Sequence, residues 1–187
     1  MQANEAYVKQ VRLLLAVLPH VAARPVFALK GGTAINFFRR NNPRLSVDID
    51  LHYLPNNERD VALRDINDNV QAIAASVTTS LPGSRVAINP GTSVAVVTHE
   101  GVHIKIEPNN VIRGTLLPPV TRSLCPNLAE RFATAPSIQC VDDTELYAGK
   151  LCAALQRQHP RDLFDVHLLL AEDGALTRDL TDTFIIS

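Results

Sequence analysis

Apolar residues near the start of the chain recur at the spacing of a helix. Over residues 4–20 they return every three or four positions, which predicts an amphipathic helix that Asn4 can cap. The same spacing over residues 58–80 predicts a second, longer helix. The two apolar stripes are Val8, Val11, Leu14, Leu15 and Leu18, then Val61, Leu63, Ile66, Val70, Ile73 and Val77. The first helix is therefore expected to pack its apolar face against the rest of the fold.

Short apolar runs bounded by glycine, proline or asparagine predict the strands. They occupy residues 26–29, 46–53, 85–89, 93–98 and 102–107. In the last run the side chains alternate, so Val102, Ile104 and Ile106 face one way and His103, Lys105 and Glu107 the other. Between the first two runs, Gly31 and Gly32 predict a turn, after which Thr33 begins a helix over residues 34–40.

The second half of the chain is weakly periodic at first and helical afterwards. Residues 108–136 are rich in proline and allow a short strand at 111–116 and a short helix at 124–132. A strand is predicted at 138–141, helices are predicted over 144–158 and 161–171, and another helix starts at residue 177. We therefore expect a core over residues 1–137 and a C-terminal helical part over residues 138–187 that packs on it.

Composition narrows the class of protein. The chain has 187 residues with a net charge of -1 and a pI of about 6.6, which excludes a wholly basic, nucleic-acid-coating surface. One local basic cluster remains, consisting of Arg24, Lys30, Arg39, Arg40 and Arg44. The three cysteines lack the spacing of a zinc site, and their odd number argues against a disulfide scaffold. No signal segment or membrane span is evident, so a cytoplasmic protein is expected.

Asp48 and Asp50 are the first candidates for chemistry. Residues two apart on a strand project to the same face, so both carboxylates are presented to one point and favour a hard cation such as Mg²⁺. A solvated strand face is the alternative explanation for such a short motif. Gly31 and Gly32 lie upstream, where bare N–H groups at a helix start suit a polyphosphate. Glu107 supplies a third acid from another strand, and three carboxylates can hold two Mg²⁺ ions.

The order of these motifs resembles a known family. The segments LKGGTA, RLSVDIDL, HIKIE, ELYAGKLCAAL and RDLFDV are similar to those of AbiEii/AbiGii-type nucleotidyltransferases. These proteins are toxins of type IV toxin–antitoxin and abortive-infection systems within the DNA polymerase β-like superfamily. The resemblance covers roughly residues 26–170 and implies an α+β fold. In that fold, a polymerase β-like nucleotidyltransferase core with a mixed sheet flanked by helices carries the C-terminal helical part.

The resemblance also implies roles for individual residues. It implies metal binding by Asp48, Asp50 and Glu107, and it leaves open whether Glu107 is a metal ligand or the base for the acceptor hydroxyl. Lys150 would bind the nucleotide, and Asp165 would orient that lysine or the substrate. Catalytic roles thus fall on Asp48, Asp50, Glu107, Lys150 and Asp165. Nucleotide binding falls on Gly31, Gly32 and Thr33 of the phosphate turn, on Arg44 and Ser46 beside the acids, and on Lys150.

The later residues also have plainer explanations. Lys150 lies among leucines on a predicted helix, where a lysine usually extends along the surface to reach water. Asp162 can cap the N-terminus of its helix. Arg161, Asp162 and Asp165 can also share an exposed face of that helix. The residues expected to pack on that helix are Leu163, Phe164, Val166, Leu169 and Leu170. Lys105 can neutralise Glu107 or contact phosphate, and His52 can line the edge of the site.

The expected function is a Mg²⁺-dependent transfer of NMP from an NTP to an acceptor hydroxyl. The resemblance implies an RNA acceptor, the 3′ end of tRNA, and a cognate antitoxin as partner. A non-catalytic nucleotide-binding module and nucleotidylation of a protein hydroxyl are the alternatives. Proteins of this family usually continue into a larger helical region after the RDLFD-type motif, so the C-terminal part is expected to be shortened.

Overall fold

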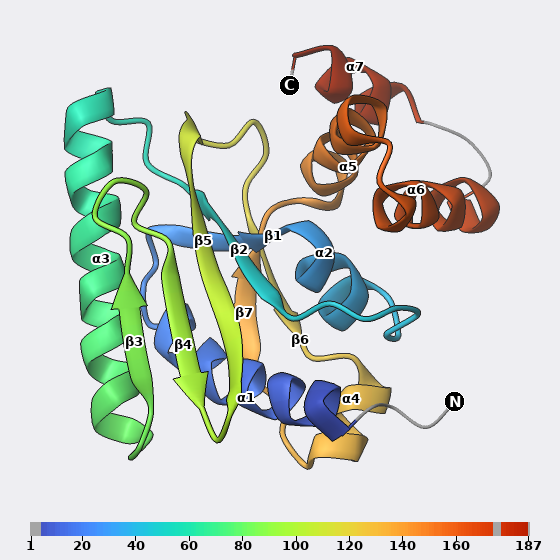
Figure 1. The fold of residues 1–187 in the computed structure, drawn as a ribbon. Helices are drawn as coiled ribbons and strands as arrows, with labels where there is room; N and C mark the ends of the chain where they lie inside the picture. The colour runs from blue at the N-terminus through green and yellow to red at the C-terminus, as the bar shows by residue number, and fades with distance from the viewer. Residues whose placement is uncertain (1–4, 174–176, 187) are drawn as a thin grey trace.

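A computed structural model describes residues 5–173 and 177–186 of the chain (Figure 1). The strands are β1 (Phe27–Lys30), β2 (Asp48–Tyr53), β3 (Arg85–Ile88), β4 (Ala95–His99), β5 (Val102–Arg113), β6 (Val120–Ser123) and β7 (Ser137–Cys140). The helices are α1 (Glu5–Ala22), α2 (Gly31–Thr33), the π-helix η1 (Ala34–Arg39), α3 (Arg59–Ser80), α4 (Pro126–Phe132), α5 (Asp143–Arg157), α6 (Pro160–Asp173) and α7 (Arg178–Ile186).

The strands form one mixed sheet in the order β3-β4-β5-β2-β1-β7-β6. Neighbouring strands are antiparallel except at β1–β7 and β2–β5, which are parallel. Helix α1 packs against β5 and β7, α3 packs against β3, β4 and β5, and the two helices contact each other. They therefore cover the same face of the sheet. The predicted α+β fold with a mixed sheet flanked by helices is confirmed.

The two predicted amphipathic helices are present because each has an apolar stripe to bury. Helix α3 buries Ala62, Ile66, Val70, Ile73 and Val77, which follow one another at helical spacing. Helix α1 buries the predicted positions Val11, Leu14, Leu15 and Leu18 among others. Asn4, the predicted cap of α1, lies outside the described residues.

The segment after β1 differs from the prediction. Instead of a turn followed by a helix from Ala34, the helix begins at Gly31 itself and continues as the π-helix Ala34–Arg39. Gly31 has a φ of 72°, a conformation that glycine adopts without steric cost. The glycine pair therefore forms the first turn of the helix, and its backbone stands directly at the end of β1.

Two strands also depart from the prediction. Strand β5 continues through Pro108 to Arg113, because it pairs in parallel with β2 and the register shifts where Pro108 would interrupt a regular ladder. Strand β6 was not predicted, since its sequence VTRS has no apolar alternation. It forms because the edge of β7 offers it a partner over four residue pairs.

The C-terminal helices gather at one side of the molecule, beyond the strands (Figure 1). Helix α5 begins after Asp142, whose carboxylate accepts a hydrogen bond from the backbone N–H of Thr144 at 2.8 Å. It packs against α6 and α7 and also contacts α2, so it links these helices to the sheet. Residues 138–140 belong to β7 within the sheet, and the division into parts at residue 137 stays a prediction. Of the helices described, none is sufficiently long and apolar to cross a bilayer.

Candidate active site

A cleft of about 940 Å³ lies between the sheet and the C-terminal helices. Its floor comes from β1, β2 and β5, and its opposite wall comes from α5 and the start of α6. Eight of the predicted site residues line it: Gly31, Gly32, Arg44, Ser46, Asp48, Asp50, Glu107 and Lys150. Residues more than a hundred positions apart in the sequence thus meet in one cavity.

The three acids lie side by side because β2 runs between β1 and β5. Asp50 is paired with Lys30 on β1 and with Glu107 on β5, while Asp48 is paired with Lys105. Glu107 forms an ion pair with Lys105 at 3.5 Å, and both side chains are partly exposed. The floor of the cleft therefore combines three carboxylates from two parallel strands with Lys30 beside them, while Lys105 pairs with Glu107 without lining the cleft.

The carboxyl of Asp50, on this floor, has a raised pKa. Burial, followed by the nearby charges of Glu107 and Asp48, raises the pKa of its carboxyl to about 6. Lys30 acts in the opposite direction, and its own pKa is lowered, mainly by burial. The lysine does not balance the cluster, so an added cation would stabilise the ionised acids.

The oxygen ligands of these acids fit a hard divalent cation. Asp48 and Asp50 share a strand face, and Glu107 is the direct neighbour of Asp50. In the part of the chain that the structure describes, however, no three His, Cys, Asp or Glu side chains converge closely enough to form a ready metal cage. The donor set is present, and the metal site itself stays a prediction.

The glycine turn lies against the acids. A Cβ atom on Gly31 would stand 2.0 Å from Oδ2 of Asp50, and one on Gly32 would stand 2.8 Å from a guanidinium nitrogen of Arg44. Thr33 donates a hydrogen bond to the backbone carbonyl of Asp48 at 2.5 Å, and its Oγ1 lies 3.0 Å from Oγ of Ser46. The turn and the acid strand are therefore held in a fixed relation, with no space for a side chain between them.

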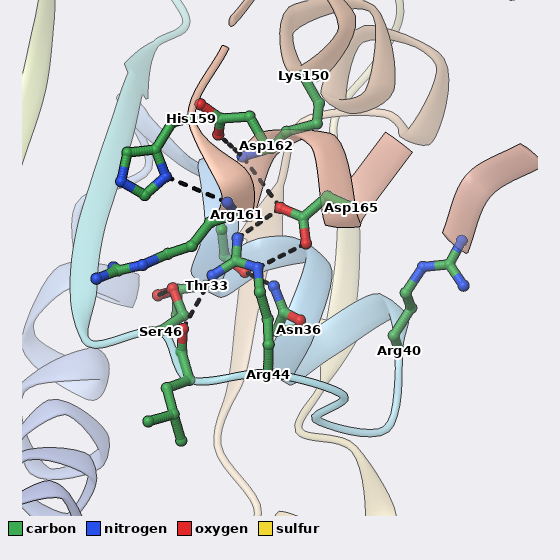
Figure 2. Close-up of polar contacts among 12 residues, drawn as sticks. Thr33, Asn36, Arg40, Arg44, Ser46, Lys150, His159, Arg161, Asp162 and Asp165 are labelled. Carbon is green, nitrogen blue, oxygen red and sulfur yellow. Dashed lines mark hydrogen bonds and ion pairs between the residues drawn. The ribbon is translucent and has the colours of Figure 1, made fainter. Parts of the chain in front are cut away.

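A buried ion network joins this turn to the C-terminal helices (Figure 2). Arg44 donates two hydrogen bonds to the carboxylate of Asp165, at 2.7 and 2.5 Å. Lys150 lies 3.1 Å from Asp165 and 3.0 Å from Asp162, which also pairs with Arg157 at 2.9 Å. The two aspartates thus hold Lys150 at the wall of the cleft, and the guanidinium of Arg44 that binds Asp165 lies against Gly32.

Two of the plainer explanations are wrong, the one for Lys150 as a surface lysine and the one for an exposed face with Asp162 and Asp165. Lys150 is only 7% exposed and does not extend along the surface, and Asp165 is fully buried. The two aspartates of α6 face inward, while Leu163, Phe164 and Leu170, which were expected to pack, are exposed. The reason is that α6 meets charged partners, Arg44 and Lys150, so its two aspartates are buried together with Leu169. Thr33 and Asp165 lie behind the lining of the cleft.

The basic cluster of the sequence does not form one surface patch. Arg39 pairs with Asp143 at 2.8 Å, Arg40 is buried and donates to the hydroxyl of Tyr147, and Arg44 is bound to Asp165. Of the cluster, Lys30 and Arg44 line the cleft. The cleft instead receives cations that the sequence did not single out, Arg113 and Arg157. Arg161 also lines it, although the sequence offered it only as part of an exposed helix face.

His52 lines the cleft at the edge of the site, as predicted. Its Nε2 lies 2.5 Å from the carbonyl oxygen of Gly114, and burial lowers the pKa of the imidazole. A neutral imidazole that donates to this carbonyl holds the loop after β5 at the rim. His52 therefore shapes the wall of the cleft.

Comparison with known proteins agrees with the fold. Residues 12–185 match the family model described as nucleotidyl transferase AbiEii toxin, type IV toxin–antitoxin system. Among solved structures, the fold is similar to that of MenT4, a nucleotidyltransferase toxin from Mycobacterium tuberculosis, with a TM-score of 0.68 and 17% sequence identity. The match covers 97% of this chain but 62% of that one, so the chain spans less than two thirds of that protein's length. No curated protein gives a significant match in sequence.

The family match extends over nearly the whole chain and includes every motif that lines the cleft. The chain therefore belongs to the AbiEii family of nucleotidyltransferase toxins of type IV toxin–antitoxin systems.

Proposed function

We propose that this protein transfers NMP from an NTP to a hydroxyl of RNA, with the 3′ end of tRNA as the acceptor, in a reaction that depends on Mg²⁺. It would act as the toxin of a type IV toxin–antitoxin pair, with a cognate antitoxin as its partner. The observation that carries the proposal is the position of Asp48, Asp50 and Glu107 on adjacent strands, directly beside a glycine turn at the floor of one cleft.

Asp48 and Asp50, with Glu107 beside them, would hold the divalent cations, which neutralise phosphate charge and polarise the reacting phosphate when bound. The acceptor oxygen forms a bond to the α-phosphorus, the bond between the α- and β-phosphates breaks, and pyrophosphate leaves with its bonding electrons. The proton of the acceptor hydroxyl passes to a carboxylate, for which Glu107 is the candidate because its side chain is partly exposed and lines the cleft beside Asp50.

The remaining residues bind and orient. The backbone of Gly31 and Gly32 lies where a phosphate can approach without meeting a side chain. Lys150 faces the cleft with a charge that two aspartates keep in place, which suits it to bind the triphosphate. Arg44 supports this arrangement from the lining of the cleft, because it donates two hydrogen bonds to Asp165, which holds Lys150.

The direct test is incubation of the purified protein with Mg²⁺, total RNA and each of the four labelled NTPs. Wild type is expected to label RNA with at least one nucleotide, and Asp48→Ala/Asp50→Ala is expected to label none. Equal labelling by the two proteins with all four nucleotides would reject the proposal. Mass spectrometry of the labelled product separates an RNA acceptor from a protein hydroxyl, and tight NTP binding without transfer identifies a non-catalytic module.

A further inference from the structure

Six lysine and arginine side chains line the cleft: Lys30, Arg44, Arg113, Lys150, Arg157 and Arg161. Four of them are matched by carboxylates of the protein itself. Arg44, Lys150 and Arg157 are ion-paired with Asp165 or Asp162. Lys30 is the cross-strand neighbour of Asp50, whose negative charge acts on it. Each of these charges therefore already has a carboxylate of the protein beside it.

Arg113 and Arg161 are the two that remain. Arg113 donates to the backbone carbonyls of Asn57 at 3.1 Å and Val111 at 3.3 Å, and neither of these carries a charge. Arg161 is exposed, and no ion pair joins it to a carboxylate among the side chains that the structure describes, those of residues 5–171 and 177–185. In Figure 2 its side chain extends away from Lys150 and Asp165. Each arginine therefore presents to the cleft a positive charge that no described carboxylate pairs with.

The two arginines come from opposite sides of the cavity. Arg113 ends β5, which forms the floor, and its backbone is fixed by pairing with Tyr53 of β2. Arg161 is in the first turn of α6, where His159 accepts a hydrogen bond from its backbone N–H at 3.2 Å. Both side chains are thus carried by ordered backbone, and the acids of the floor lie in the same cavity.

The charges of the floor explain why such cations are needed. A polyanionic substrate that enters a cleft with Asp48, Asp50 and Glu107 on its floor is repelled unless cations offset them. Metal ions would offset the charge at the reacting phosphate. Phosphates farther along the substrate require fixed positive charges at the rim, and guanidinium groups bind phosphate in a bidentate manner.

We infer that Arg113 and Arg161 form a pair of phosphate-binding residues across the cleft, which hold phosphate esters of the substrates on either side of the reacting centre. The inference rests on the proposed function for the identity of those substrates. The phosphates can belong to the backbone of the acceptor strand or to the NTP, and the two sources predict different measurements.

The test compares the full chain with Arg113→Gln/Arg161→Gln. Binding of a labelled single-stranded RNA is measured by fluorescence anisotropy without NTP at several KCl concentrations, and NTP binding is measured by calorimetry. If the pair holds the RNA backbone, the double variant loses RNA affinity, and the slope of log K against log [salt] becomes shallower by about 1.4, or about 0.7 for each lost contact. If the pair holds the triphosphate, NTP affinity falls instead and the RNA slope is unchanged.

Two further variants complete the design. Arg64→Gln/Arg85→Gln removes two exposed arginines of α3 and β3 outside the cleft and should change neither the RNA slope nor the NTP affinity. Arg113→Lys/Arg161→Lys keeps both charges and should restore most of the slope. The inference is overturned if the glutamine variant has the circular dichroism and thermal midpoint of wild type and binds RNA and NTP as wild type does.

The experiments distinguish a failure of this inference from a failure of the proposed transfer reaction. Wild type that binds RNA with the arginine-dependent slope but labels nothing would keep the inference and reject the transfer reaction. Wild type that labels RNA, while the glutamine variant has unchanged KM for RNA and NTP, would reject the inference and keep the transfer reaction.

Discussion

At the scale of single residues, the two buried carboxylates of the site differ in whether a cation of the protein pairs with them. Asp50 holds a carboxyl with a pKa raised to about 6, whereas Asp165 is more deeply buried and yet has two cations bound to it. The first acid is therefore prepared for an added cation. The second is part of the scaffold.

The raised pKa of Asp50 predicts a stability change in the metal-free protein. The unfolded carboxyl ionises near its ordinary value of 3.8 and the folded one near 6, so the folded state holds the proton to higher pH. Stability from this group is therefore present below about pH 4 and is lost as the pH rises to about 6. Asp50→Asn should raise the free energy of unfolding at pH 7 by about 1–3 kcal/mol.

Urea denaturation in EDTA at pH 4 and pH 7 measures this effect. The gain should be small at pH 4. In a separate assay with Mg²⁺ at pH 7, where wild type is expected to label RNA, Asp50→Asn should lose transfer activity. A variant that is less stable than wild type at pH 7 would contradict the assignment of the raised pKa to Asp50.

Gly31 offers a second prediction at this scale. Gly31→Ala places a methyl group 2.0 Å from Oδ2 of Asp50 and should reduce the labelling rate by about a hundredfold, because the acid must move. Gly101→Ala is a matched control, since Gly101 has a φ of 78° but open space around its Cβ position. Both variants should lose about 1–2 kcal/mol of stability from backbone strain. Equal activity in the two variants would show that the contact with Asp50 has no role.

At the scale of elements, the important joint is the one between the phosphate turn and α6. It consists of Arg44 on the loop before β2, Asp165 on α6 and Lys150 on α5. The sequence places these residues far apart, and nothing in their local patterns indicates that they meet. The two aspartates of α6 are buried because of this joint.

Arg44→Ala should destabilise the protein by about 3 kcal/mol, because it leaves the buried carboxylate of Asp165 with Lys150 alone. Arg39→Ala, which breaks a half-exposed pair with Asp143, should cost no more than about 1 kcal/mol. Denaturant unfolding measures both.

If Arg44 serves only this joint, Arg44→Lys should recover part of the kcat that Arg44→Ala loses, while KM for NTP stays unchanged. A rise in KM for NTP, with kcat unchanged, would instead make Arg44 a direct ligand of the triphosphate.

At the scale of the whole molecule, the sheet and the helical part form a single cleft whose walls come from both. A cation that binds the acids of the floor binds the folded state alone, since the unfolded chain does not bring the two strands together. Metal binding should therefore be visible as a change in global stability.

Mg²⁺ at about a hundred times its dissociation constant should add about 2.7 kcal/mol and raise the thermal midpoint by about 5–10 °C. Asp48→Asn/Asp50→Asn removes the donor pair and should abolish the rise. Differential scanning calorimetry with and without EDTA gives the comparison. A rise of the same size in both proteins would place the stabilising cation elsewhere.

Much of this molecule follows from local patterns in its sequence. The apolar stripes of α1 and α3, the alternation of β2 and β5, and the glycine pair after β1 each act over a few residues, so each can be recognised without knowledge of the fold. The acids Asp48, Asp50 and Glu107 were predicted for the same reason, since strand geometry alone puts them on one side of each strand.

What only the tertiary structure decided are the relations between distant segments. The parallel pairing of β2 with β5 sets Asp50 beside Glu107, β6 exists because β7 offers it an edge, and Lys150 is buried because two aspartates of α6 surround it. Burial and charge pairing depend on partners far away along the chain. For that reason the sequence by itself determined which residue types were available to the site, while packing decided which charges are neutralised and which are left for a substrate.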